Sequence, residues 1–385
     1  MKKIKLVMIT FTIIMCPIIL CGCWNYVEID NFAIVAGVAI DKDITTNKYI
    51  ITSEIITTQM SGASSIISSE LYRTEGDSVL AAVRNTIEKT GLKLFWSDAK
   101  ILIISKSIAM EGIIPAIDWV NRSSDTRPDM WVLISKEDSA SEILKSKVKL
   151  NDVTSFLLNE TMKSGVSLSK FANSRVWSFI NEISSAGKSG AIATIESELN
   201  DGNSFLRVAG SAVFNSDKLV GYLNENETLY MTLIKNQLKE GLIVLQNVSG
   251  SGTNTTLEIH GSKTKLTPIY TNGRASLIID IYPTTSLEEV QGTKDFIEEK
   301  NLKILQSEAE NEMESNMQSL ISKLQKDYHS DVLGFEEVFE KEKPKVSKAF
   351  KKSGEDIFAS LKTEVNVHIQ IINTSLTNHP ITIEE

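Results

Sequence analysis

The sequence predicts an α+β protein with several domains, in which mixed and antiparallel sheets pack against helices and one long helix covers the C-terminal sheet. Three observations lead to this class. Buried-strand runs alternate with helical patterns before residue 150, a hairpin pattern follows residue 206, and one apolar stripe at helical spacing runs from about residue 294 to 328. With 42% apolar residues and only 7 prolines in 385, the chain is long enough for two or three globular domains.

We expect three domains behind a removable N-terminal segment. The predicted parts are a lipoprotein signal peptide (1–22), an N-terminal α/β domain (23–150), a middle subdomain or connector (151–205) and a C-terminal α+β domain (206–385). Beyond residue 23 no apolar run reaches the length of about 20 residues that a membrane-spanning helix needs. The chain is therefore not expected to form a channel by itself.

The N-terminus has the composition of a bacterial lipoprotein signal. Three lysines stand within the first five residues, the apolar run Leu6–Leu20 follows, and the motif Leu-Cys-Gly-Cys ends at Cys23. This motif places a thiol just beyond small residues, so we predict that Cys23 is lipidated, although Cys21 offers a competing thiol. Two or three acyl chains hold a protein firmly on a bilayer, because each buried methylene contributes about 0.8 kcal/mol. The alternative is a retained signal anchor that holds the same domain on the same side of the membrane.

The net charge and the positions of the cysteines exclude several classes of function for this protein. The formal net charge is −9, and it becomes −12 when the three lysines of the signal are removed. An acidic body argues against nucleic-acid binding and against electrostatic adhesion to anionic lipid, since both need a positive face. Cys16, Cys21 and Cys23 all lie in or at the end of the signal, so no disulfide, zinc–cysteine cluster or cysteine nucleophile is expected in the mature body.

The N-terminal domain is predicted from alternating strand and helix patterns. FAIVAGVAI (Phe32–Ile40) has the composition of a buried strand, and Tyr49–Ile56 is its antiparallel return. Residues 61–69 are mostly small, and we expect a loop there. Further strands are expected at Lys100–Ile104 and Met130–Ser135. A helix is expected at Ser78–Thr90, which is apolar at Val79, Ala82, Val83 and Ile87 and is followed by Gly91 as a stop signal. Two more helices are expected at Gly112–Val120 and, behind a serine cap, at Ser139–Leu144. Between Val153 and Ile192 the pattern is mixed, which favours a smaller helical subdomain or connector.

The C-terminal domain is predicted as an antiparallel sheet with the long helix across its apolar face. A hairpin around a polar turn (207–223) begins the domain, and further strands are expected at 254–260 and 275–282. From about Lys294 to Tyr328 the apolar positions form one helical stripe, which predicts a long helix with one buried side. Strict alternation of apolar and polar residues over Glu364–Ile371 predicts a strand covered on one face only.

The sequence contains no pattern that favours catalysis or metal binding. His260, His329, His368 and His379 show none of the HxxxH, HxH or HExxH spacings of metal sites. Adjacent acids such as Glu288-Glu289 are typical of solvated faces. Neither GxSxG nor GxGxxG nor a complete phosphate-binding loop occurs. We therefore predict a non-enzyme with no catalytic residues, no metal and no cofactor.

Short motifs follow one another along the chain in an order that characterises one protein family. In the first half they are Cys23-Trp24, Glu28-Ile29, Ala33–Asp43, Leu94-Phe95-Trp96, Lys100–Ser105, Ala109, Glu111-Gly112 and Arg127. In the second half they are Gly210, Ala212-Val213-Phe214, Lys218–Leu223, Glu227, Tyr328, Asp331-Val332, Gly334-Phe335 and Pro344. In these motifs the chain resembles the Ger(x)C spore germination lipoproteins over nearly the whole mature sequence. The family often has a tryptophan after the Pro344 region, whereas this chain has none beyond Trp177.

The resemblance implies a role without chemistry and a three-domain α+β fold. The chain is expected to be the C subunit of a nutrient germinant receptor, required for spore germination and tethered by N-terminal acyl chains to the outer leaflet of the spore inner membrane. Its expected partners are a membrane-associated A subunit and a membrane-spanning B subunit, and no nucleic acid. We expect it to act by assembly, and the candidate docking surfaces are the polar face of Glu364–Gln370 and the exposed side of the helix Asp295–Tyr328.

Two other hypotheses belong to different classes. A solute-binding lipoprotein that captures the nutrient for a membrane partner predicts a cleft between two similar α/β lobes joined by a hinge. A cell-envelope hydrolase requires a convergent catalytic set, and the sequence shows none.

Overall fold

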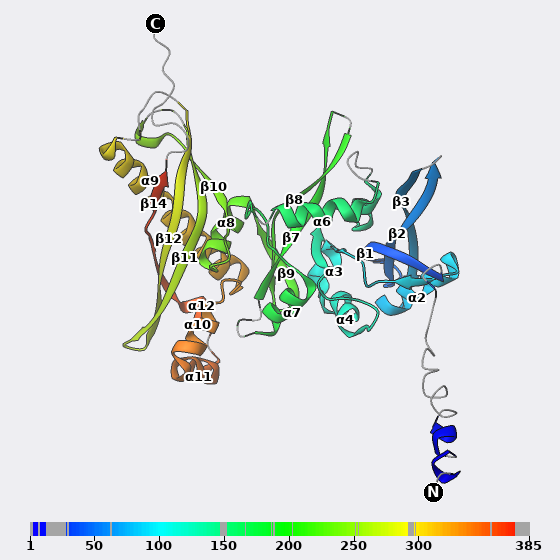
Figure 1. Cartoon of the computed structure of the whole chain (residues 1–385). Coiled ribbons are helices and arrows are strands. Elements are labelled where there is room, and N and C mark those ends of the chain that lie inside the picture. Colours follow the sequence, from blue (N-terminus) through cyan, green and yellow to red (C-terminus); the bar gives the residue numbers. More distant parts are fainter. Residues whose placement is uncertain are drawn as a thin grey trace.

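The computed structural model contains two β-sheets that follow one another along the molecule, each covered by helices (Figure 1). The structure describes residues 3–6, 8–12, 28, 31–61, 64–146, 152–165, 167–185, 187, 189–201, 203–250, 252, 254–291, 296, 298–354 and 356–373. The predicted α+β class with mixed sheets is confirmed. Within the ranges just given, no helix combines the length and the apolar character that crossing a membrane requires.

The first sheet has nine strands and a parallel centre. In spatial order they are β3 (Ser64–Gly76), β2 (Tyr49–Ser61), β1 (Phe32–Lys42), β5 (Ile101–Ser105), β6 (Trp131–Ser135), β7 (Ser189–Asn200), β8 (Asn203–Asn215) and β9 (Lys218–Leu223), with β4 (Lys93–Phe95) also paired to β1. Strands β1, β5, β6 and β7 run parallel, and antiparallel strands extend the sheet at both edges. Central parallel strands are buried on both faces, which explains the short and almost wholly apolar sequences of β5 and β6.

Helices cover both faces of this sheet. One face carries α2 (Val79–Thr90), α3 (Lys106–Glu111), α4 (Ile114–Arg122) and α7 (Val176–Ser184), and the other carries α5 (Ser141–Lys145) and α6 (Thr154–Gly165). The side chains of β5 alternate between the two resulting cores. Leu102 and Ile104 join the core under α2 and α4, whereas Ile101 and Ile103 join the core under α5 and α6.

The cap of α5 comes mainly from a distant strand. The carboxylate of Asp41, at the end of β1, accepts hydrogen bonds from the backbone N–H groups of Ala140 (2.6 Å) and Ser141 (3.1 Å). A carboxylate at this position also interacts favourably with the positive end of the helix dipole. The hydroxyl of Ser139, predicted as the cap, accepts from the N–H of Ser141 at 3.3 Å and contributes less. The predicted serine cap is therefore corrected to a cap shared with Asp41.

The serine-rich segment 61–69 was predicted as a loop, and this prediction is wrong for Ser61 and for 64–69, which belong to β2 and β3; residues 62 and 63 lie outside the described residues. The pairing of β2 with β3 runs without a break from Tyr49 opposite Gly76 to Ser61 opposite Ser64. The hydroxyl groups of Thr57 and Ser68 lie 2.8 Å apart across the ladder. Hydroxyl pairs of this kind stabilise neighbouring strands, and small polar residues suit a strand at the sheet edge.

The hairpin at 207–223 was predicted to begin the C-terminal domain. Its strands β8 and β9 instead extend the first sheet, because β8 pairs with β7 along most of its length. The segment 153–192, predicted as a helical connector, contributes α6, α7 and the start of β7 to the same half of the molecule. The structural first half therefore reaches residue 223.

The second sheet has five strands and is also mixed. They are β10 (Gly241–Leu245), β11 (Thr255–Thr271), β12 (Arg274–Val290), β13 (Lys362–Val367) and β14 (Gln370–Asn373). Strands β10, β11 and β12 are antiparallel, but β13 and β14 both pair parallel to β12. The fully antiparallel sheet predicted for this domain is therefore wrong. The chain reaches β13 through several helices, and a long helical connection of this kind allows a parallel return.

One long helix covers the apolar face of the second sheet, as predicted. Helix α9 (Glu299–Lys323) continues through a π-helical turn (Leu324–Tyr328). Its buried residues are Leu305, Ala309, Met313, Met317, Leu320 and Ile321. The remaining helices of this half are η2 (Val248–Gly250), α10 (Phe335–Glu342), α11 (Pro344–Ser353) and α12 (Ile357–Ser360).

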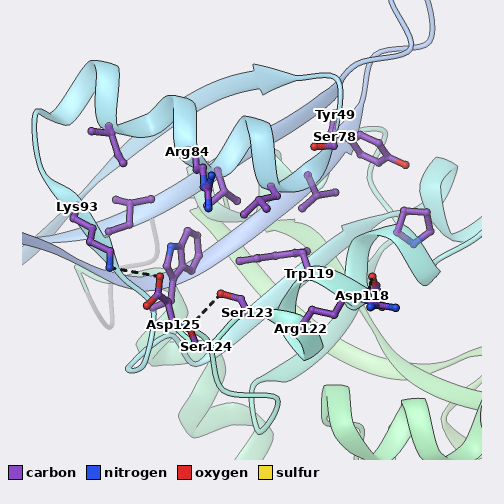
Figure 2. Close-up of a pocket in the computed structure, with 17 residues that line it drawn as sticks. Tyr49, Ser78, Arg84, Lys93, Asp118, Trp119, Arg122, Ser123, Ser124 and Asp125 are labelled. Atoms are coloured by element: carbon purple, nitrogen blue, oxygen red, sulfur yellow. Dashed lines mark hydrogen bonds and ion pairs between the residues drawn. The ribbon is translucent and has the colours of Figure 1, made fainter. Parts of the chain in front are cut away.

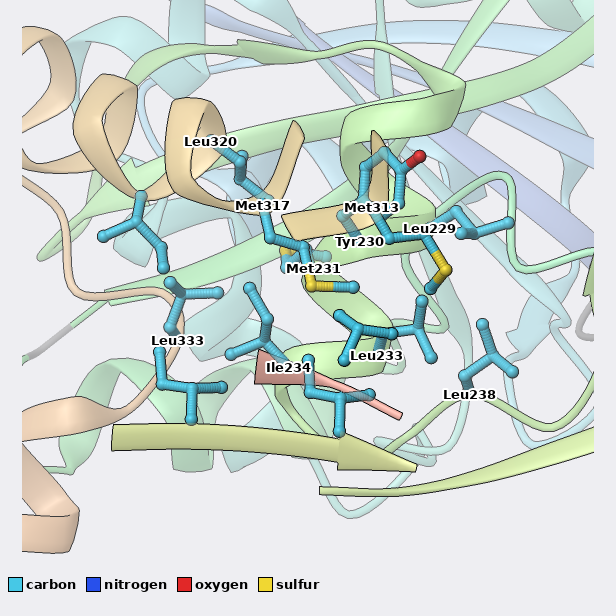
Figure 3. Close-up of a cluster of buried hydrophobic side chains, with 14 of the residues drawn as sticks. Leu229, Tyr230, Met231, Leu233, Ile234, Leu238, Met313, Met317, Leu320 and Leu333 are labelled. Carbon is cyan, nitrogen blue, oxygen red and sulfur yellow. The ribbon is translucent and has the colours of Figure 1, made fainter. Parts of the chain in front are cut away.

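A buried helix joins the two halves. Helix α8 (Glu225–Ile234) contacts β8 and β9 of the first sheet, and also α9, β11 and β12 of the second half. All of its residues from 228 to 234 are buried. Figure 3 shows Leu233 and Ile234 of α8 in one cluster with Met317 of α9. The two halves therefore share a continuous hydrophobic core.

Candidate functional site

A groove between α2 and α4 on the first half is the candidate binding site (Figure 2). Its volume is about 720 Å³. Helix α2 turns Val79, Ala82 and Val83 toward the sheet, and this leaves Leu80 and Ile87 on the groove side with exposed fractions of 43% and 42%. Ile87 was predicted among the apolar positions of the helix, and the structure places it at the rim of the groove instead of in the core.

The floor of the groove is aromatic. Trp96 and Trp119 are almost fully buried and meet edge to face, with ring centroids 5.1 Å apart and an interplanar angle of 79°. The indole Nε1 of Trp119 is buried and has no hydrogen-bond acceptor among the described residues. Buried tryptophan N–H groups usually have an acceptor, so the Trp119 donor is an exception in this core.

Charged side chains surround the rim, and most of them are paired. Arg122 bonds to Asp118 one helical turn earlier (Nε to Oδ2, 2.7 Å), and the Nζ atom of Lys93 lies 3.6 Å from Oδ2 of Asp125. Exposed pairs of this kind contribute little to stability. No carboxylate of the described residues lies within ion-pair distance of Arg84, so this guanidinium is the rim charge most open to a ligand.

The groove is suited to binding. The described residues that line it include no histidine, cysteine or glutamate, and no serine hydroxyl among them is hydrogen-bonded to a carboxylate. An aromatic floor, aliphatic rim residues and one cation without an ion pair fit an amphipathic segment that carries a carboxylate.

The predicted site residues fall in three places. Cys23, predicted as the lipidated residue, lies outside the described residues. The polar positions Glu364, His368 and Gln370 point outward from the second sheet, as predicted, although the single predicted strand is divided into β13 and β14. His368 stacks on Tyr282, with ring centroids 5.0 Å apart. The helix predicted at Asp295–Tyr328 exposes its polar side along α9. Neither of the two predicted docking surfaces on the second half adjoins the groove.

A smaller cavity of about 320 Å³ lies between the two halves and holds a buried acid. Asp331 is 6% exposed, and its carboxylate accepts hydrogen bonds from the backbone N–H groups of Phe335 (2.9 Å) and Glu336 (2.7 Å). Burial raises the pKa of Asp331 to about 7, against the opposing effect of these two bonds. The same cavity is lined by an ion pair between Lys235 and Glu182 (2.6 Å). The junction therefore contains a group that changes charge near neutral pH.

Two family models match consecutive parts of the chain. The model described as "Spore germination protein N-terminal domain" matches residues 25–197. The model described as "Spore germination B3/ GerAC like, C-terminal" matches residues 209–375. The chain belongs to the Ger(x)C family of spore germination proteins.

Relatives of this Ger(x)C protein are similar over almost their whole length. The putative spore germination protein YfkR of Bacillus subtilis (strain 168) is 23% identical, over 90% of this chain and 91% of the relative. Spore germination proteins KC and B3 of the same organism are 21% and 22% identical, over 94% and 92% of this chain and 95% and 94% of the relatives. The crystal structure of the GerBC protein has the same fold, with a TM-score of 0.55 and 17% identity over 88% of this chain and 97% of that chain.

Several Ger(x)C motif residues meet at the junction of the halves. A Cβ atom on Gly221 would lie 2.2 Å from the ring of Tyr328, so only glycine allows this contact. The Tyr328 hydroxyl donates to the carbonyl oxygen of Tyr222 (2.8 Å) and accepts from its N–H (3.2 Å). Lys323 forms an ion pair with Glu227 (2.8 Å) and donates to the same carbonyl (3.1 Å). Together with Lys323, these motif residues therefore fix the end of α9 and its π-helical turn to the edge strand β9, which is a structural role.

Proposed function

We propose that this Ger(x)C chain is a lipoprotein that acts as the C subunit of a nutrient germinant receptor. Acyl chains on Cys23 hold it on the outer leaflet of the spore inner membrane, and it acts by assembling with the A and B subunits, without catalysis. The observation that carries the proposal is the position of the family match, which begins at residue 25, two residues after the predicted lipid attachment site. The body of the protein thus follows directly on the segment that resembles a lipoprotein signal.

We infer that the groove is the docking surface, because the short chain between Cys23 and β1 limits how far the groove can lie from the predicted anchor. Phe32, the first residue of β1, is nine residues after Cys23, and an extended chain spans at most about 3.6 Å per residue. The start of β1 therefore lies within about 32 Å of the lipidated residue. Phe32 pairs in register with Lys93 of β4, and Lys93 lines the groove. The tether thus keeps the groove close to the bilayer, where partner subunits present their extramembrane segments.

The occupant we propose is an amphipathic segment of a membrane partner, with apolar side chains over Leu80 and Ile87 and a carboxylate near Arg84. Confinement to a plane raises the effective concentration of such a segment, so a modest groove is sufficient. The solute-binding alternative requires two similar lobes around a cleft. Here the two sheets differ in strand number and order, and α8 fills the space between them, so the architecture does not favour that alternative.

Lipid attachment is tested with two cysteine variants expressed in spores that lack the native protein. Cys23→Ala should lose the acyl mass in mass spectrometry of the mature protein, leave the membrane fraction and reduce nutrient-triggered germination. Cys21→Ala is the matched control, because it removes a neighbouring thiol and keeps Cys23, and it should behave like the native protein. Normal germination with a soluble, unacylated Cys23→Ala protein would contradict the proposal.

Docking is tested by co-purification of the receptor subunits from detergent-solubilised membranes. Leu80→Asp combined with Ile87→Asp should reduce recovery of the partners about tenfold or more, because each change places a charge on an apolar contact. Leu242→Asp on β10 is the matched control, since Leu242 has a similar exposed fraction of 44% and lies on the second sheet. Equal recovery with the groove and control variants would exclude the groove as the docking surface.

A further inference from the structure

Three side chains with metal-binding atoms converge on the outer face of the second sheet. Glu258 and His260 stand two residues apart on β11, and Glu288 stands on the neighbouring strand β12. One donor atom from each of the three lies within 4.8 Å of the other two. We propose that Glu258, His260 and Glu288 bind one divalent transition-metal cation, of the zinc or manganese type.

Two β-bulges bring these side chains together. Pairing passes from Thr256 opposite Glu289 to Leu257 opposite Leu287, which leaves Glu288 as the extra residue of β12. Three positions further, pairing passes from Ile259 opposite Thr285 to Gly261 opposite Thr284, which leaves His260 as the extra residue of β11. A bulge redirects the side chain of its extra residue, and bulges are frequent beside functional sites. Both extra residues of this ladder are potential ligands, and Glu258 lies in the short regular stretch between them.

A buried serine orients two of the three side chains. Ser286 is 3% exposed and stands in register with Glu258. Its hydroxyl donates to Oε1 of Glu288 (2.5 Å) and lies 2.6 Å from Nε2 of His260. Since the hydroxyl proton is directed to Glu288, its lone pairs accept from Nε2–H, and this tautomer leaves Nδ1 of the imidazole unprotonated for a metal. Hydrogen bonds of this kind commonly fix metal ligands in proteins.

The charge of the cluster favours a cation. The two carboxylates approach each other across the ladder, and like charges at such positions are destabilising. Among the described residues, no lysine, arginine or histidine forms an ion pair with Glu258. A divalent ion would offset the repulsion between the two carboxylates and join β11 to β12 near β14, which pairs with β12 at Ser286.

The donor set selects the class of metal. Calcium and magnesium prefer sites made of oxygen atoms only, whereas an imidazole beside carboxylates suits zinc, manganese and similar ions. Ligands of such an ion stand about 2.0–2.2 Å from it, so two of them lie up to about 4 Å apart. The donor atoms lie within 4.8 Å of one another, so the side chains must rotate toward one another to reach this spacing. Three protein ligands leave a further position for water.

The proposal is tested with the full chain in detergent, freed of metal with a chelator. Titration calorimetry with zinc chloride should show one equivalent bound, and manganese chloride should compete with it. Cobalt chloride should give visible d–d absorption at the same stoichiometry. His260→Gln and Glu288→Gln should each weaken zinc binding about tenfold or more, whereas His368→Gln should leave it unchanged, because His368 is an exposed histidine of the same sheet. Circular dichroism of each variant establishes that the fold is kept.

Two results would overturn the proposal. One is the absence of one-equivalent binding by the native chain. The other is zinc affinity in folded His260→Gln and Glu288→Gln proteins equal to that of the His368→Gln protein. Neither result depends on whether the chain carries acyl groups or germinant receptor partners.

Discussion

The hydroxyl of Tyr328 offers a direct test of the junction between the two halves. It is bonded to both backbone polar groups of Tyr222, on the edge strand β9. In Tyr328→Phe the carbonyl of Tyr222 keeps the ammonium group of Lys323 at 3.1 Å, but the N–H loses its acceptor. A hydrogen bond contributes about 0.5–1.5 kcal/mol net, and an unsatisfied buried donor costs about 1–3 kcal/mol. Because one of the two groups stays satisfied and the site is only partly buried, we expect a loss of about 1–2 kcal/mol in the free energy of unfolding.

The measurement is urea unfolding followed by circular dichroism, with the loss read from the midpoint at unchanged slope. Tyr282→Phe is the matched control, because Tyr282 is 46% exposed and its hydroxyl has no hydrogen bond to the described residues. Exposed changes of this kind usually stay within about 0.5 kcal/mol. If Tyr328→Phe destabilises the protein no more than Tyr282→Phe does, the structural role given to these motif residues is wrong.

Two more predictions concern the buried junction. Leu233→Ala removes a fully buried side chain of α8, and we expect it to lower the free energy of unfolding in urea by about 2–5 kcal/mol. The control Leu242→Ala changes an exposed residue and should cost less than about 1 kcal/mol. Similar losses in both variants would show that α8 is not packed as described. Burial raises the pKa of Asp331 to about 7, so the folded state holds the Asp331 proton more tightly than the unfolded state does. The resulting stabilisation of the folded state is complete below about pH 3.8 and is lost as the pH rises through about 7. Asp331→Asn should therefore flatten the fall in unfolding free energy between about pH 3.8 and about pH 7, while Asp327→Asn, an exposed change, should keep the native slope.

Elements with a strong local signal could be predicted from the sequence. Phe32–Ile40 is apolar throughout because both faces of β1 are covered, and the stripe of α9 shows which side meets the sheet. The cap of α5 could not be predicted, because its main acceptor, Asp41, lies 99 residues before Ala140 in the chain. A hairpin pattern also carries no information about which sheet it joins, so the pairing of 207–223 with the first sheet could not be predicted.

The candidate sites depend on tertiary structure even more strongly. The groove takes residues from four separate segments, and only the motif Leu94-Phe95-Trp96 drew attention to one of them. The metal cluster has no characteristic sequence spacing, since Glu288 follows His260 by 28 residues. The two side chains come close only because of two β-bulges. Each of its residues alone looks like an ordinary solvated side chain. The pairing register of β11 and β12 decides which side chains form the cluster, and a pattern of residue types does not reveal this register.

Helix α8 makes the connection between the two halves rigid. A hinge between two bodies needs an exposed connection that can bend. Here the connection is a helix whose residues 228–234 are all buried. Bending it would open the core that both sheets share. The two halves are therefore expected to move together as one rigid body, because neither sheet can turn relative to the other without exposing this shared core.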